Sequence, residues 1–97
     1  MELGDVFQQG ITTVVNGDYF DIQPAGTENI VIHNICTDGE CELYFFDGTN
    51  DVLIDTLTEG GSWSAQYFHC TNAKRIRVKN TSGGDIKCYA DGVYTKL

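Results

Sequence analysis

Turn-forming residues interrupt this chain at intervals of roughly 8 to 12 residues, a spacing typical of antiparallel β-sandwiches and small barrels. The segments between the turns are short and rich in β-branched and aromatic residues, and long runs of good helix formers are missing. The chain has 97 residues, a length that supports one hydrophobic core and one domain. We therefore predict an all-β fold, an antiparallel β-sandwich that is jelly-roll-like and has about nine short strands.

The first eleven residues lack the alternation of a strand and contain two glycines and two glutamines. We predict an N-terminal arm at residues 1–11, which is ordered by a neighbouring molecule, and a single β-sandwich domain at residues 12–97. Within this domain, Asn16-Gly17 separates two strand-like segments, 12–15 and 18–22. This residue pair favours a two-residue type I′ turn, so the two segments are predicted to form a hairpin.

Charged residues are unevenly distributed along the chain. All six basic residues follow position 73, whereas twelve of the fourteen acidic residues precede it, and the formal net charge is −8. Ile76 and Val78 alternate with Arg75, Arg77 and Lys79, which predicts a strand with one apolar and one basic face. This basic face either neutralises acidic strands beside it or forms a docking edge for an acidic partner surface. The overall negative charge disfavours nucleic acid and anionic membranes as partners.

The four cysteines, Cys36, Cys41, Cys70 and Cys88, permit three interpretations. The start of the sequence does not match a secretory signal, so synthesis in the cytoplasm and reduced thiols are expected. In an oxidising compartment, a disulfide between Cys36 and Cys41, which flank a predicted hairpin loop, would contribute about 2 kcal/mol. Zinc binding by the cysteines with His69 is disfavoured, because the spacing is a poor match to a zinc knuckle. We predict no metal and no cofactor.

Sequence motifs give little support for catalysis. His33 and His69 lie in predicted strands, and the sequence contains no nucleophile elbow, zinc-protease motif or phosphate loop, so we predict that the protein is not an enzyme. Residues 47–51 are rich in oxygen-bearing side chains but lack the downstream glutamate of an EF-hand, which favours a turn over a calcium site. An aromatic platform for sugar rings is a further interpretation, although aromatic side chains in so small a domain usually fill the core. Its members would be Trp63, Tyr67 and Tyr44.

Several strand-and-turn segments resemble those of small all-β virion proteins of tailed bacteriophages, in particular capsid decoration (cement) proteins. These segments are 31–35, 42–44 with 47–50, 76–84 and 89–93, and they are distributed over residues 17–96. The resemblance implies a jelly-roll-like module, commonly trimeric, that lies on the outside of an icosahedral shell and clamps neighbouring coat subunits. It transfers no functional residue, and the four cysteines are not part of the family pattern.

The function we expect is that of a non-enzymatic virion structural protein, which decorates and stabilises a bacteriophage capsid by binding capsid protein. The capsid surface is its expected location, and a trimer is the favoured homo-oligomer. The alternative is a phage tail or fibre domain, or another carbohydrate-binding β-sandwich. The residues predicted to contact the partner are Leu3, Val6, Phe7 and Ile11 in the arm, and Arg75, Arg77 and Lys79 in the basic strand.

Overall fold

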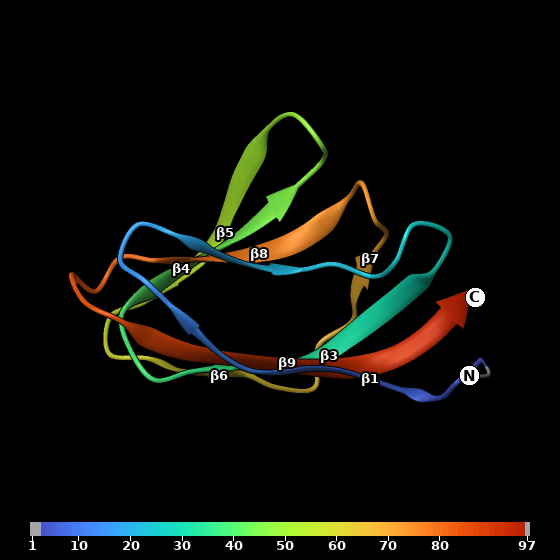
Figure 1. Cartoon of the computed structure of the whole chain (residues 1–97), viewed down its shortest axis with the longest axis horizontal. Coiled ribbons are helices and arrows are strands. Elements are labelled where there is room, and N and C mark those ends of the chain that lie inside the picture. Colours follow the sequence, from blue (N-terminus) through green and yellow to red (C-terminus); the bar gives the residue numbers. More distant parts are fainter. Residues whose placement is uncertain (1–2, 97) are drawn as a thin grey trace.

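The structure is a computed structural model that describes residues 3–96 as two antiparallel sheets packed face to face (Figure 1). It confirms the predicted all-β sandwich. The strands are β1 (Val6–Val14), β2 (Tyr19–Ile22), β3 (Asn29–Thr37), β4 (Cys41–Phe46), β5 (Asp51–Leu57), β6 (Gly61–Trp63), β7 (Phe68–Cys70), β8 (Arg75–Asn80) and β9 (Ile86–Lys96).

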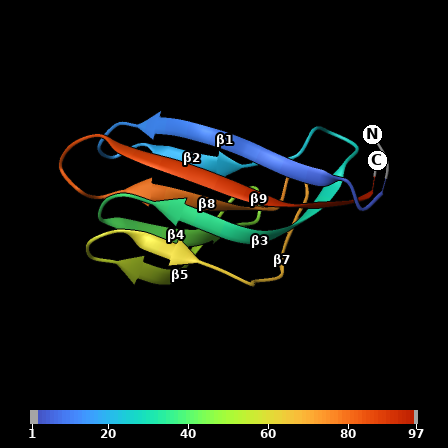
Figure 2. The same cartoon turned by 90° about the horizontal axis from the view of Figure 1, so that it is seen from below.

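The strand order is that of a jelly roll. One sheet has the order β1-β9-β3-β6, with β7 also paired to β3, and the other has the order β2-β8-β4-β5. β6 pairs with the end of β3 and β7 with its beginning. Most consecutive strands therefore alternate between the two sheets, as in a double-sheet jelly roll. As a result, β1 and β5 lie at opposite flanks of the sandwich (Figure 2).

The turn at Asn16-Gly17 is present, but the predicted hairpin is wrong, because β1 and β2 belong to different sheets. The backbone N–H of Asp18 donates to the carbonyl of Val15 at 3.0 Å. Gly17 has a φ of +83°, whereas Asn16 does not have a positive φ. Positive φ at the second central residue alone fits a type II turn and not the predicted type I′ turn. Type II turns splay their flanking strands, and here the chain crosses from one sheet to the other.

Residues 6–11, which were expected to belong to an N-terminal arm, form the first part of β1. The strand pairs with β9 from Val6 opposite Val93 onward, and a bulge lies between Gln9 and Thr12. The bulge shifts the register and breaks the period-two alternation by which a strand is recognised in sequence. Residues 6–11 are thus ordered by β9 of the same chain.

The core lies between the sheets and is built from the inward side chains of both. Ile30, Val31 and Ile32 are buried in succession on β3, which has neighbours on both edges of its sheet. Where β9 pairs with β3, Gly92 lies opposite Ile32, and a Cβ on Gly92 would overlap the carbonyl oxygen of Val31, so this position requires glycine. Core side chains from the other sheet include Phe20, Ile22, Leu43, Ile76 and Val78.

Candidate functional site

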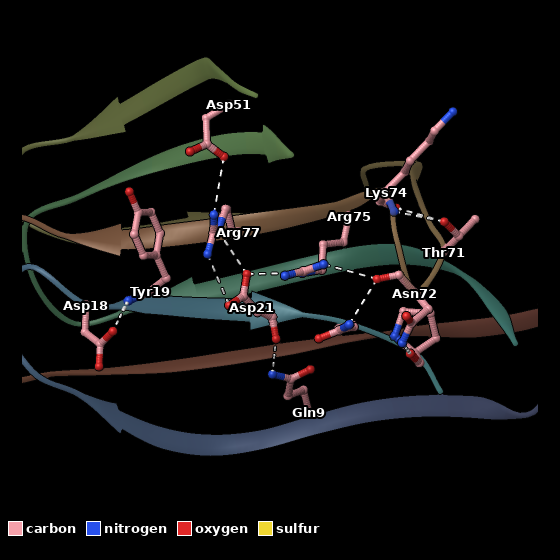
Figure 3. Close-up of polar contacts among 12 residues, drawn as sticks. Gln9, Asp18, Tyr19, Asp21, Asp51, Thr71, Asn72, Lys74, Arg75 and Arg77 are labelled. Atoms are coloured by element: carbon pink, nitrogen blue, oxygen red, sulfur yellow. Dashed lines mark hydrogen bonds and ion pairs between the residues drawn. The ribbon is translucent and has the colours of Figure 1, made fainter. Parts of the chain in front are cut away.

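The basic face of β8 is covered by carboxylates from neighbouring strands (Figure 3). Arg75 Nε lies 3.2 Å from Asp21 Oδ1, and Arg77 Nε lies 2.9 Å from the same oxygen. Arg77 Nη1 lies 3.5 Å from Asp51 Oδ1, which reaches across from β5. Both arginine side chains are only 15% exposed. The two arginines therefore pair with carboxylates on the strands beside them, as in the first of the two interpretations offered by the sequence.

Aromatic rings cover the same two guanidinium groups. Arg77 Cζ lies 3.9 Å from the centre of the Tyr19 ring and 4.5 Å from that of Phe46. Arg75 Cζ lies 4.8 Å from the Phe46 ring, and Lys79 Nζ makes a longer contact of 5.9 Å with Tyr19. Such cation–π contacts strengthen where water is excluded. The guanidinium groups thus link β8 to β2, β4 and β5 and present little free charge to a partner.

The residues predicted to form the arm are divided between the surface and the core. Leu3, Val6 and Ile11 are exposed, and Ile11 is 76% exposed. Phe7 is only 9% exposed and packs edge-to-face against Tyr94, with ring centres 5.7 Å apart. Phe7 therefore belongs to the core, and its prediction as a partner contact is wrong. Successive residues of a strand point to opposite faces, so Phe7 is buried where Val6 is exposed. The other three residues, which we call the β1 stripe, are exposed on β1 or just before it.

β5 carries a second group of exposed apolar side chains, which the sequence analysis did not single out. Val52, Leu53 and Ile54 are 63%, 51% and 44% exposed, and every residue from Asp51 to Thr56 is exposed. The β4–β5 hairpin rises away from the rest of the sandwich (Figure 1). A continuous apolar run usually indicates a buried strand, so the pattern pointed to the core. The flanking carboxylates, Asp51 and Asp55, were the signal for exposure.

The four cysteines are free thiols, so the disulfide considered for Cys36 and Cys41 is not formed. The loop between these residues joins β3 to β4 in the other sheet, and Cys36 is exposed whereas Cys41 is buried. Burial raises the pKa of the Cys70 thiol to about 11 and that of Cys88 to about 12, and it also raises the pKa of Cys41. These three thiols stay protonated at neutral pH and act as small core side chains.

Trp63 does not form an exposed platform with the tyrosines. Its ring is buried, and its Nε1 donates to Asp55 Oδ2 at 2.8 Å. Tyr67 is exposed and contacts His33 edge-to-face, with ring centres 5.3 Å apart. Tyr44 lies on the other sheet and donates to Glu42 at 2.8 Å, which raises the pKa of its hydroxyl to about 12. An aromatic site for sugar rings would therefore depend on Tyr67 without Trp63.

The loop at 47–51 uses its first carboxylate to form a turn. Asp47 Oδ1 accepts hydrogen bonds from the backbone N–H groups of Thr49 at 2.9 Å and Asn50 at 2.7 Å. These two bonds, led by that from Asn50, lower the pKa of Asp47. Such local bonds are typical of an Asx turn. Over residues 3–96, no three His, Cys, Asp or Glu side chains gather into a group that could hold a metal ion.

A hollow of about 230 Å³ lies on the flank of the sandwich near Cys36. Ligand pockets usually have volumes of about 300 to 1,000 Å³, so this hollow is smaller than a typical small-molecule site. Its lining comes from β1, the end of β3 and β9, and includes Ile11, Lys87 and Tyr89. The edge strands β1 and β5 are therefore the more prominent surface features.

No protein-family model matches the chain, and no curated protein matches it in sequence. In the part of the chain that the structure describes, no helix has the length and apolar character needed to cross a membrane.

Proposed function

We propose that this protein is a non-enzymatic virion structural protein, which decorates and stabilises a bacteriophage capsid by binding coat subunits on the capsid surface. It works as a homo-oligomer, with a trimer favoured, and needs no cofactor for this role. The resemblance of its strand-and-turn segments to capsid decoration proteins supports the proposal, as does its jelly-roll fold.

The distribution of exposed apolar side chains is the observation that carries the proposal. Eight large apolar residues are exposed among those described, and seven of them lie in or next to the edge strands β1 and β5. Exposed apolar residues on edge strands promote association, and proteins usually protect such edges. A module that is covered by neighbouring subunits is protected in this way. The seven residues are Leu3, Val6, Ile11, Val15, Val52, Leu53 and Ile54.

Binding to the shell stabilises it by linkage, because a ligand that favours assembled coat subunits over dissociated ones shifts that equilibrium. The β1 stripe suits this role, since β1 pairs with β9 on both sides of the bulge that contains Ile11, so the backbone that carries Val6 and Ile11 is already ordered. An ordered backbone loses less conformational entropy on binding than a flexible arm would lose.

The proposal is tested by co-sedimentation with purified capsids of tailed bacteriophages that lack their own decoration protein. The wild-type chain is expected to sediment with at least one such shell. The Ile11→Glu variant is expected to bind at least about tenfold more weakly, because it puts a charge into an apolar contact. The control is Tyr67→Glu, which changes an exposed aromatic residue away from both edge strands and leaves binding within about twofold.

Absence of wild-type binding to every shell would contradict the capsid role. Equal loss of binding in the Ile11→Glu variant and in the Tyr67→Glu control would contradict the assignment of the β1 stripe. Sedimentation velocity of the free protein tests the trimer, and a monomer at all concentrations would exclude it.

The alternative, a phage tail or fibre domain or another module that binds host glycan, rests on the exposed ring of Tyr67. It predicts that the wild-type chain is retained on cell-wall polysaccharide and that Tyr67→Ala is not retained. Retention of neither protein would eliminate this alternative.

A further inference from the structure

The turn between β1 and β2 contains Asn16-Gly17, the single Asn-Gly pair of the sequence, and both residues are exposed. Such a pair is chemically labile, because glycine has no side chain to shield its backbone nitrogen. After losing its proton to hydroxide, the Gly17 nitrogen can attack Cγ of Asn16. A bond forms between this nitrogen and Cγ, the bond from Cγ to Nδ2 breaks, and ammonia leaves. Water then opens the cyclic imide to aspartate or isoaspartate.

The folded turn opposes the first step of this reaction. The backbone N–H of Gly17 donates to the carbonyl of Asn80 at 2.8 Å. A hydrogen-bonded backbone N–H is protected from base until the bond opens. Oδ1 of Asn16 accepts from the backbone N–H of Gly83 at 2.9 Å, which ties the side chain to the turn between β8 and β9. Both reacting groups are therefore engaged with other parts of the chain.

The backbone conformation of the turn also opposes ring closure. The ring closes only when the Cβ of Asn16 and the nitrogen of Gly17 lie on the same side of the Cα–C bond of Asn16. In a type II turn, ψ of the first central residue is about +120°, which places these two atoms on different sides. The φ of +83° at Gly17 and the bond from Asp18 to Val15 identify this turn type. The turn must therefore open before Asn16 can react.

The second turn, residues 81–85 between β8 and β9, helps to keep the first one closed. Both turns lie at the same end of the sandwich (Figure 1). Asn80 is fully buried at the end of β8, and its side chain donates to the carbonyls of Val14 at 2.8 Å and Gly84 at 2.6 Å. Its Oδ1 accepts from the backbone N–H and from the hydroxyl of Ser82, both at 2.8 Å. Asn80 thus connects the end of β1 to the second turn.

We propose that Asn16 is a site of spontaneous deamidation, and that opening of the β1–β2 turn, residues 15–18, sets the rate of the reaction. While the turn is closed, the Gly17 N–H stays bonded to Asn80 and the ring cannot form. When the turn opens, Gly17 attacks and ammonia is released. Deamidation at Asn16 therefore records how often this end of the sandwich opens. The proposal concerns the chemistry of the turn and does not depend on the capsid role.

The main product changes the turn that produced it. Isoaspartate at position 16 adds one methylene group to the backbone between the Cα of that residue and the nitrogen of Gly17. The lengthened turn cannot keep both the bond from Gly17 to Asn80 and the bond from Asp18 to Val15 in their present geometry. Accumulation of isoaspartate should therefore leave this end of the sandwich more open than before.

Incubation of the full chain in mildly alkaline buffer tests the proposal, with one sample folded and one unfolded in guanidinium chloride. Mass spectrometry of proteolytic peptides measures aspartate and isoaspartate at position 16. A synthetic peptide of residues 12–21, incubated in both buffers, corrects for any effect of guanidinium on the chemistry itself. After this correction, Asn16 is expected to react at least about tenfold more slowly in the folded chain, because hydrogen bonds must first be broken.

Ser82→Ala loosens the second turn without changing either reacting residue. The Ser82 hydroxyl donates to the carbonyl of Gly84 at 2.9 Å and accepts from its N–H at 3.2 Å. Its removal is expected to raise the folded-state rate about threefold or more. The matched control is Thr71→Ala, which removes a hydroxyl that accepts from the N–H of Lys74 at 3.0 Å in the turn before β8. This control should leave the rate within about twofold.

Hydrogen exchange at the Gly17 amide, followed by NMR, gives a second readout. The opening that lets Asn16 react also exposes this N–H, so Ser82→Ala should raise exchange and deamidation by similar factors. Circular dichroism confirms that each variant is folded.

Several results would overturn the proposal. Equal corrected rates in the folded and unfolded chains would show that the fold does not restrain Asn16. Faster exchange at Gly17 in Ser82→Ala with an unchanged deamidation rate would show that turn opening does not set the rate. An equal acceleration in Ser82→Ala and Thr71→Ala would assign the reaction to unfolding of the whole chain.

Discussion

β8 and β5 lie on either side of β4 in one sheet, and they differ in which of their side chains are exposed. β8 carries three basic residues, of which Arg75 and Arg77 are largely covered by carboxylates and aromatic rings. β5 carries a run of three apolar residues that are all exposed. The charged strand therefore contributes to the structure of the sheet, and the apolar strand contributes a surface.

The cause of the difference is the number of neighbours that each strand has. β8 is paired on both edges, with β2 and β4, so side chains from these two strands and from β5 can reach its outer face. β5 is paired on one edge only, and its hairpin rises from the sandwich (Figure 1). Position in the sheet thus decides whether a charged or an apolar side chain is available to a partner.

The largest effect expected concerns two leucines of the β4–β5 hairpin. Leu43 is fully buried on β4, so Leu43→Ala should lower the free energy of unfolding by about 3 kcal/mol through lost burial and a cavity. Leu53 on β5 is exposed, so Leu53→Ala should lower it by less than about 1 kcal/mol. Urea unfolding followed by circular dichroism measures both. A similar loss in the two variants would show that β5 is covered in solution.

A somewhat smaller effect is expected on the other side of the comparison, at Asp21. This carboxylate lies within 3.2 Å of Arg75 Nε and 2.9 Å of Arg77 Nε. Asp21→Ala leaves two largely buried guanidinium groups without their shared partner and should lower the free energy of unfolding by about 2 kcal/mol. The control is Asp47→Ala, which removes an exposed turn carboxylate without an arginine contact and should cost less. Equal losses would mean that the cover over β8 adds no stability.

The smallest effect is expected at the contact between β5 and Trp63. The Trp63 indole N–H and then the Thr56 backbone N–H lower the pKa of Asp55, whose ordinary value is 3.8. A lowered folded-state pKa gives a stabilising contribution that is present above the ordinary value and is lost as the pH falls through the folded value. Trp63 fluorescence should therefore stay constant from neutral pH down to about pH 4 and change below it.

Asp55→Ala should show the altered Trp63 emission already at neutral pH, because the acceptor at 2.8 Å is gone. Asp47→Ala is the matched control, since Asp47 also has a lowered pKa but bonds to its own turn. A pH profile of Asp55→Ala that coincides with that of the wild type would contradict the role of this contact.

Local patterns predicted the strands better than they predicted the strand pairing. The alternation of Ile76 and Val78 with basic residues identified both faces of β8, and the structure buries these two side chains. At Asn16-Gly17 the turn was predicted, but the hairpin was not formed, because local sequence does not specify which sheet receives the next strand. The same reason separates Cys36 from Cys41, whose strands lie in different sheets.

The candidate surfaces were predicted only in part. Leu3, Val6 and Ile11 are exposed as a partner contact requires, whereas Phe7 is buried. Strand β5 was missed as a surface because an apolar run has the same appearance in a covered strand and in an open edge strand. Only its place at the end of the β2-β8-β4-β5 order distinguishes the two cases.

The position of β9 between β1 and β3 affects how the chain is made and folded. On the ribosome, β1 and β3 are synthesised long before residues 86–96. Until those residues emerge, the sheet lacks β9, the strand that pairs with both β1 and β3. Folding of this sheet must therefore wait until residues 86–96 have been translated, and contacts between distant parts of the chain make it slow. A nascent chain halted before residue 86 should remain sensitive to protease, whereas the released protein should resist it.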